Sequence, residues 1–112
     1  MTNEEYSKLA LGTAPDTNLS NRILLGALGL TGEAGEVAEL VKKHVFHDHL
    51  LDRSKLIREL GDVLWYLNFL AVKVADVSLA TVMEVNITKL AARYPEGHFS
   101  AERSMNRAVN DE

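Results

Sequence analysis

The stretch GALGLTGEAGEV, residues 26–37, decides how the fold of this chain is interpreted. It has the apolar spacing of the front half of an amphipathic helix, yet four of its twelve residues are glycine. An interior glycine destabilises a helix by about 1 kcal/mol relative to alanine, so four glycines cost about 3–4 kcal/mol. The same stretch places Glu33 and Glu36 at the edge of the apolar face. Glycine and glutamate together on a core helix indicate that this face also forms the wall of a site.

The composition indicates a single globular domain over residues 1–112. The chain is 46% hydrophobic and 25% charged, with two prolines and no cysteine, and it shows no linker or repeat. A net charge of −4 argues against nucleic acid as the main partner, because nucleic acid requires a basic surface. The longest apolar run, Val63–Val72, is too short to span a bilayer. The start, MTNEEYSK, is unlike a signal peptide, so we expect a cytoplasmic protein without a membrane partner.

Capping residues and apolar periodicity predict an all-α fold that resembles a four-helix bundle. No segment alternates with a period of two, so no sheet is expected. Pro95 stops the last helix, and the tail from about Glu96 is predicted to be polar and loosely packed. The predicted helices are Asn3–Leu11, Asn18 or Ser20 to about Val45, Asp52 or Ser54 to about Ala75, and Ser78 to about Tyr94.

Two of these helices carry long apolar stripes that we expect to form the core. In the second helix the stripe contains Ile23, Ala27, Leu30, Ala34, Val37, Val41 and Val45. In the third helix it contains Leu56, Leu60, Val63, Leu67, Leu70 and Val74. Trp65 and Phe69 lie on the other side of the third helix, which is therefore apolar nearly all round. A small bundle can hardly cover both sides, so the pattern predicts a homo-oligomer with this helix at the interface.

Two pairs of acidic residues occur at a spacing of three, Glu33 with Glu36 and Glu59 with Asp62. Residues three apart share one face of a helix, so antiparallel packing can bring the four carboxylates into one cleft. Four such charges require protonation or bound cations, and a hard cation such as Mg²⁺ takes oxygen ligands of this kind. The alternative is an ordinary charged surface. None of the four has a basic residue four positions further on, although Arg58 stands four before Asp62 and can pair with it.

A polar row on the fourth helix offers a second group of candidate ligands. Asn86, Lys89 and Arg93 follow at steps of three and four, and an amide with two cations along one edge suits a phosphate chain. A solvated, salt-bridged face is the alternative. On the third helix, Tyr66 and Lys73 continue the face that carries the acidic pair.

The glycines of residues 26–37 permit the close approach of something flat or bulky, because they have no Cβ. A partner helix is one candidate for this neighbour and a nucleotide base is the other. The stretch is not a phosphate-binding loop, since no Gly-Lys-Ser/Thr follows it.

Three blocks of the sequence, which together cover most of the chain from Leu25 to Arg107, resemble a known family. The resemblance is to the MazG-like branch of the all-α nucleoside triphosphate pyrophosphohydrolase superfamily. The blocks are GLTGEAGEVAELVKKH (Gly29–His44), ELGDVLWYLNFLA (Glu59–Ala71) and NITKLAARYPEGHFSAERSMNR (Asn86–Arg107). Their order, and the KLAARYP that closes the fourth helix, make the resemblance specific.

The resemblance implies a MazG-type fold and a specific reaction. Members hydrolyse a nucleoside triphosphate between the α and β phosphates and so help to clean the nucleotide pool. Glu33, Glu36, Glu59 and Asp62 match the catalytic positions that bind Mg²⁺, with Mn²⁺ as a substitute. Glu36 is our candidate for accepting the proton of the attacking water.

The resemblance also implies substrate contacts and an assembly. Asn86, Lys89 and Arg93 would hold the phosphates, and Trp65 and Tyr66 would lie near the sugar or base. Members form dimers or tetramers. Two other functions stay open, a phosphoribosyl-ATP pyrophosphohydrolase-like enzyme and a non-catalytic nucleotide-binding or regulatory helical protein. A di-iron protein would require Glu-x-x-His pairs, which the sequence lacks.

Overall fold

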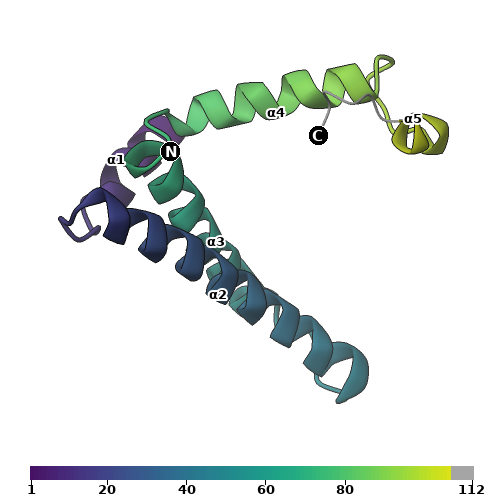
Figure 1. Cartoon of the computed structure of the whole chain (residues 1–112). Helices are drawn as coiled ribbons and strands as arrows, with labels where there is room; N and C mark the ends of the chain where they lie inside the picture. The colour runs from purple at the N-terminus through teal and green to yellow at the C-terminus, as the bar shows by residue number, and fades with distance from the viewer. Residues whose placement is uncertain (107–112) are drawn as a thin grey trace. The chain divides into compact units, whose positions relative to one another are not determined.

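The computed structural model describes residues 1–106 and contains helices but no strand within them (Figure 1). The chain divides into two compact units, Met1–Leu79 and Ala80–Glu112. Arg107, which ends the last resemblance block, and the rest of the predicted 1–112 domain after it lie outside the described residues. Within residues 1–106 no helix is long and apolar enough to cross a membrane. The helices are α1 (Asn3–Leu11), α2 (Leu19–Phe46), α3 (Arg53–Lys73), α4 (Leu79–Arg93) and α5 (Ala101–Met105).

Side-chain caps fix where the first helices begin, as the sequence predicts. The Asn18 carboxamide oxygen accepts a hydrogen bond of 2.8 Å from the backbone N–H of Asn21 at the start of α2. The Asp52 carboxylate accepts one of 3.0 Å from the backbone N–H of Lys55 at the start of α3. These bonds satisfy backbone donors that a helix leaves free in its first turn. All four predicted helices are confirmed, with α3 ending two residues earlier than expected, at Lys73.

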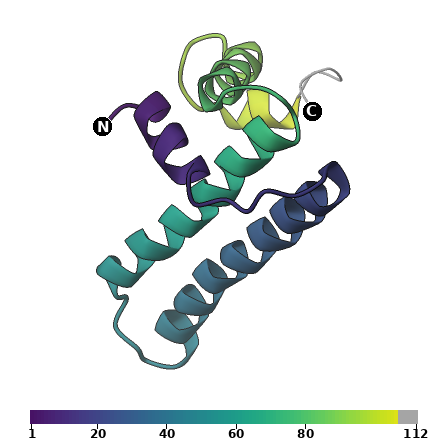
Figure 2. The same cartoon turned by 90° about the vertical axis from the view of Figure 1, so that its left-hand side faces the viewer.

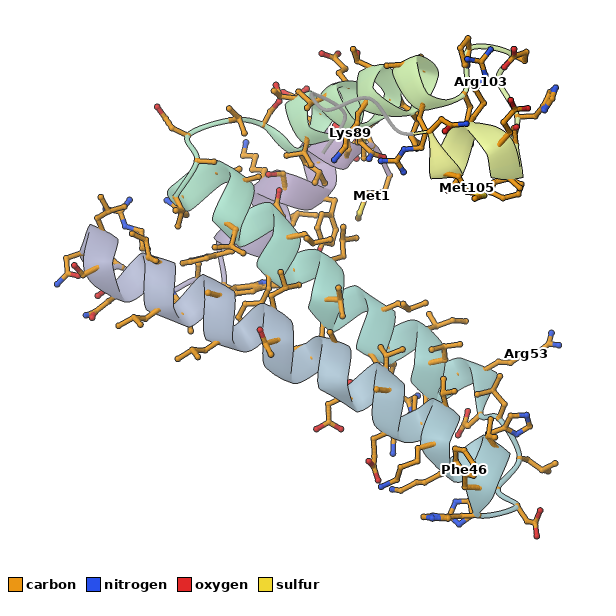
Figure 3. All side chains as sticks on the ribbon, turned by 45° about the vertical axis from the view of Figure 1, so that its right-hand side comes forward. Met1, Phe46, Arg53, Lys89, Arg103 and Met105 are labelled. Carbon is orange, nitrogen blue, oxygen red and sulfur yellow. The ribbon has the colours of Figure 1, made fainter. Side chains whose placement is uncertain are left out.

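The C-terminal tail is more ordered than the sequence indicates. Ser100 caps the short helix α5, because its hydroxyl accepts a hydrogen bond of 3.3 Å from the backbone N–H of Arg103. Arg103, labelled in Figure 3, also forms an ion pair of 3.2 Å with Glu96. The sequence analysis did not predict this short helix, although none of its residues is buried. A helix of five residues is too short to show an apolar period.

In the first unit, α2 and α3 form an antiparallel hairpin, and α1 packs against α3 (Figure 2). Gly26 and Gly29 lie where the two long helices meet. A Cβ on Gly26 would overlap the Leu70 side chain, and a Cβ on Gly29 would overlap the Tyr66 ring. At these two positions, the neighbour that approaches the glycines is therefore helix α3 of the same chain.

The apolar stripes of α2 and α3 form the core of this hairpin only in part, because Leu70 packs against Gly26 whereas several other members of the stripes stay exposed. The row of α2 that meets α3 runs instead through Gly26 and Gly29, since glycine lets the two backbones come close. The other members of both stripes lie to one side of this row, and antiparallel helices place them on the same side of the hairpin. We call this side the apolar flank. Its large exposed members are Ile23 (45%), Val41 (46%), Val45 (58%), Leu60 (50%) and Leu67 (43%).

The opposite side of α3 is covered by the chain's own N-terminal segment. Phe69 is 1% exposed and stacks on Trp65, with ring centroids 5.4 Å apart. The Trp65 indole N–H donates a hydrogen bond of 2.9 Å to the hydroxyl of Thr13, just after α1. This side of α3 therefore does not need a second copy of the chain. Asn68 beside it is fully buried, and its amide has no hydrogen-bond partner among the described residues.

Two glycine substitutions test the close approach of the helices. We expect Gly29→Ala to lower the free energy of unfolding by about 1–3 kcal/mol, because the new methyl group displaces Tyr66. Gly32→Ala is the matched control. A Cβ there meets open space, so the better helix propensity of alanine should raise stability by up to about 1 kcal/mol. Urea denaturation measures both, and a stabilising Gly29→Ala would contradict the packing described.

Candidate functional site

Three carboxylates meet between α2 and α3. Glu33 comes from α2, and Glu59 and Asp62 come from successive turns of α3. One oxygen of each lies within 4.8 Å of the others. Glu33 stands one turn after Gly29, so the glycine contact that brings the helices together also brings Glu33 opposite the acidic pair. Glu33 and Glu59 are half-buried, and Asp62 is exposed.

The fourth predicted carboxylate, Glu36, lies outside this group. It stands one turn further along α2 and is exposed. The structure therefore brings together three of the four predicted acids. Gly32 and Gly35 stand beside the acids of α2, and a Cβ on either would meet nothing within 4 Å. Because these two residues have no side chain, the surface next to Glu33 and Glu36 is open.

The three carboxylates repel one another and have no basic partner within residues 1–106. Partial burial raises the pKa of the Glu33 carboxyl above its ordinary value, and the charges of Asp62 and Glu59 raise it further. Arg58 does not neutralise Asp62, since its guanidinium donates instead to the Ser54 hydroxyl at 3.2 Å. The alternative of a salt-bridged Asp62 is therefore not found.

The three residues fit a hard divalent cation. Such ions prefer carboxylate oxygens, and Mg²⁺ binds them at about 2.0–2.1 Å, so that two ligands of one ion lie no more than about 4.2 Å apart. Oxygens that already lie within 4.8 Å of one another reach this arrangement by small rotations of their side chains. A cation here would also relieve the repulsion that raises the pKa of Glu33.

An aromatic wall stands next to the carboxylates. Glu33, Asp62, Trp65 and Tyr66 line a hollow of about 280 Å³. The two rings meet edge to face, with centroids 4.9 Å apart, and the hydrogen bond to Thr13 fixes the indole. A flat ligand can stack on such a wall while a charged part of it reaches the carboxylates.

Tyr6 is a neighbour of the site that the sequence did not indicate. It lies on α1 and is half-buried. Burial raises the pKa of its hydroxyl, and the charge of Asp62 raises it further. Its proximity to Asp62 follows from how α1 packs on α3, and no spacing within α1 reveals it.

The predicted phosphate ligands lie on the second unit. Asn86, Lys89 and Arg93 follow one another along α4, where Asn86 is exposed and the other two are half-buried. Figure 3 labels Lys89 on this helix. Their role in the site stays a prediction.

The fold and the site define an all-helical protein with a carboxylate centre suited to a divalent cation and an aromatic wall beside it. The chain belongs to the family of the MazG nucleotide pyrophosphohydrolase domain, whose model matches residues 24–98. A curated relative, the Gene 37 protein of Mycobacterium phage L5, is 45% identical over 74 residues. The matched region is 62% of this chain, and the chain spans 64% of the relative's length. No solved structure matches the chain.

The raised pKa of Glu33 predicts how metal-free protein responds to pH. A carboxyl whose pKa is higher in the folded state destabilises that state when it is ionised. Stability should therefore rise as pH falls through the folded pKa towards the lower, unfolded value. Glu33→Gln removes this effect, so in EDTA at neutral pH it should melt at a higher temperature than the wild type.

Below the ordinary pKa of glutamate the difference in melting temperature should vanish. Mg²⁺ should raise the melting temperature of the wild type more than that of Glu33→Gln. Glu39→Gln, which alters a half-buried glutamate of the same helix paired with Lys42 at 3.4 Å, is the control and should not reproduce the gain. A Glu33→Gln protein that melts below the wild type in EDTA would contradict the crowding of these acids.

Proposed function

We propose that this chain is a Mg²⁺-dependent nucleoside triphosphate pyrophosphohydrolase. It converts a ribo- or deoxyribonucleoside triphosphate to the monophosphate and pyrophosphate and so helps to clean the nucleotide pool. The observation that carries the proposal is the group of three carboxylates beside an aromatic hollow. A net charge of −4 argues against nucleic acid as the main partner, and a cytoplasmic location is part of the proposal.

The roles of the residues follow from where each one lies. The carboxylates of Glu33, Glu59 and Asp62 would hold Mg²⁺, which when bound neutralises phosphate charge and makes a water molecule more acidic. Glu36 is exposed and stands outside the group, so its carboxylate is available to accept the proton of that water. The water oxygen then bonds to phosphorus, the α–β anhydride bond breaks, and pyrophosphate leaves.

The remaining contacts orient the nucleotide. Trp65 and Tyr66 offer ring faces and edges to the base or sugar next to the carboxylates. Asn86, Lys89 and Arg93 are assigned to the phosphates, because an amide and two cations along one helix edge suit oxyanions. This assignment is supported by their spacing on α4.

A homo-oligomer, a dimer or a tetramer, is part of the proposal. The apolar flank leaves five large aliphatic side chains between 43% and 58% exposed on two neighbouring helices. Contiguous exposed apolar surface of this kind marks an interaction site. A second copy of the chain would cover the flank and leave the carboxylates, which lie off this flank, open to substrate.

Turnover of a nucleotide panel tests the reaction. The panel contains the ribo- and deoxyribonucleoside triphosphates and phosphoribosyl-ATP, each with Mg²⁺ and with EDTA, and pyrophosphate and orthophosphate are measured separately. We expect Mg²⁺-dependent release of pyrophosphate. Asp62→Asn and Glu36→Gln should each lower kcat by at least about 100-fold while the circular dichroism spectrum is kept.

Glu39→Gln, on the same helix as Glu36, is the matched control and should retain wild-type turnover. Near-normal activity of Asp62→Asn would contradict the metal centre. Release of orthophosphate in place of pyrophosphate would contradict the assigned bond.

The apolar flank is tested by the mass of the protein in solution. We expect Leu67→Glu and Val41→Glu to lower the mass measured by light scattering, because each buries a charge in the proposed interface. Leu9→Glu changes a leucine on α1 that is 64% exposed and should leave the mass unchanged. A wild-type chain that is monomeric at every concentration measured would contradict the assembly.

A further inference from the structure

A second hollow lies at the closed end of the hairpin and has no part in the function proposed so far. Its volume is about 430 Å³. It is formed within the first unit by the end of α2, the loop 47–52 and the start of α3. Figure 3 labels Phe46 and Arg53, which flank this loop. The lining residues are Leu40, Lys43, His49, Leu50, Asp52 and Lys55, and we call this site the lysine hollow.

The helical register places the lysine hollow on the same face as the carboxylates. Lys43 follows Glu36 by seven residues on α2, and Lys55 precedes Asp62 by seven residues on α3. Seven residues are two turns, so each lysine lies on the same side of its helix as its acid, about 10 Å further along. Because the helices are antiparallel, both steps lead towards the closed end. The two lysines therefore converge on the same hollow.

The two cations of the lysine hollow have no acidic partner among residues 1–106. Lys42, by contrast, pairs with Glu39 at 3.4 Å. Asp52 is the one acid in the lining, and its carboxylate caps α3 by accepting a 3.0 Å hydrogen bond from the backbone N–H of Lys55. Two ammonium groups thus share the hollow with one carboxylate, which leaves its lining with a net positive charge.

The loop that closes the hollow is held in place. The ring Nδ1 of His44 lies 2.9 Å from the backbone oxygen of His49 and, as a donor, hydrogen-bonds to it. This bond ties the loop back to α2 and sets His49 in the lining. A hollow with a fixed wall, two lysines and an imidazole is suited to an anion with several oxygens.

We propose that the lysine hollow binds the β and γ phosphates of the nucleotide and holds pyrophosphate after cleavage, which leaves the α-phosphate to Asn86, Lys89 and Arg93. The identity of this anion rests on the proposed function. Along α3 the order is Trp65, then Asp62, then Lys55, so the aromatic wall and the lysines lie on opposite sides of the carboxylates. A nucleoside triphosphate has the same order of parts, with the base at one end, the α–β anhydride in the middle and the terminal phosphate at the other end.

Calorimetric titration of the whole chain tests this assignment. The probes are inorganic pyrophosphate and a nucleoside monophosphate, each in Mg²⁺ buffer. We expect Lys43→Gln and Lys55→Gln each to weaken pyrophosphate binding about tenfold, because each removes one charged hydrogen bond. Binding of the monophosphate should be unchanged, since it has no terminal phosphates. Lys42→Gln, next to Lys43 but paired with Glu39, is the matched control and should bind like the wild type.

The outcomes separate this inference from the proposed function. If the wild type hydrolyses a triphosphate but both lysine variants bind pyrophosphate normally, the lysine hollow is overturned and the function stands. If no triphosphate is cleaved but pyrophosphate binds and requires both lysines, the anion site stands and the function fails. Equal weakening of pyrophosphate and monophosphate binding would also overturn the assignment, as would displacement of pyrophosphate by an equal concentration of sulfate.

Discussion

The close contact of α2 and α3 at Gly26 and Gly29 is the constraint on which the rest of the structure depends. The Leu70 side chain and the Tyr66 ring occupy the space that a Cβ on these glycines would take. A larger residue at either position would push the helices apart, because packed side chains do not compress. One turn beyond Gly29 the same approach brings Glu33 opposite the acidic pair of α3. The spacing of the carboxylates is therefore set by apolar packing, one turn away from the charges.

This arrangement works against the stability of the folded chain at two places. The glycines lower the helix propensity of α2, and the three carboxylates repel one another. Partial burial, and then the charges of Asp62 and Glu59, raise the pKa of the Glu33 carboxyl. Packing explains Gly26 and Gly29 but not Gly32, which has no neighbour within 4 Å that would exclude a side chain. Proteins place such local conflicts at sites of function. The conflict here is confined to the face that carries the carboxylates.

The helices and the grouping of the acids could be predicted because both are local properties. Asn18 and Asp52 mark helix starts through bonds that reach only three residues along the chain. The spacing of Glu59 and Asp62 on one helix face likewise needs no knowledge of the fold. Once α2 and α3 pair as a hairpin, the register of the two helices determines whether Glu33 comes close to this pair. The part of the site that follows from helix periodicity, the grouping of the acidic residues, could thus be predicted from the sequence.

The contacts between elements could not be predicted in this way. An apolar stripe shows that a face of α2 is suited to burial, but it does not show what covers it, and Val45 is 58% exposed in the single chain. The hairpin is packed on the glycine row, where the small residues give a weaker apolar signal. Trp65 is covered by the segment around Thr13, and Tyr6 comes near Asp62, through the placement of α1. These are tertiary contacts between residues about 50 positions apart.

The hairpin places the apolar flank and the carboxylates on different sides. The apolar flank contains aliphatic residues of both helices and no member of the carboxylate group. The other side carries the aromatic hollow, the carboxylates and the lysine hollow in sequence along the helices. A partner chain on the apolar flank would therefore stabilise the hairpin without covering the site. It would also hold α2 and α3 at a fixed separation, which the carboxylates, left to their own repulsion, would tend to increase.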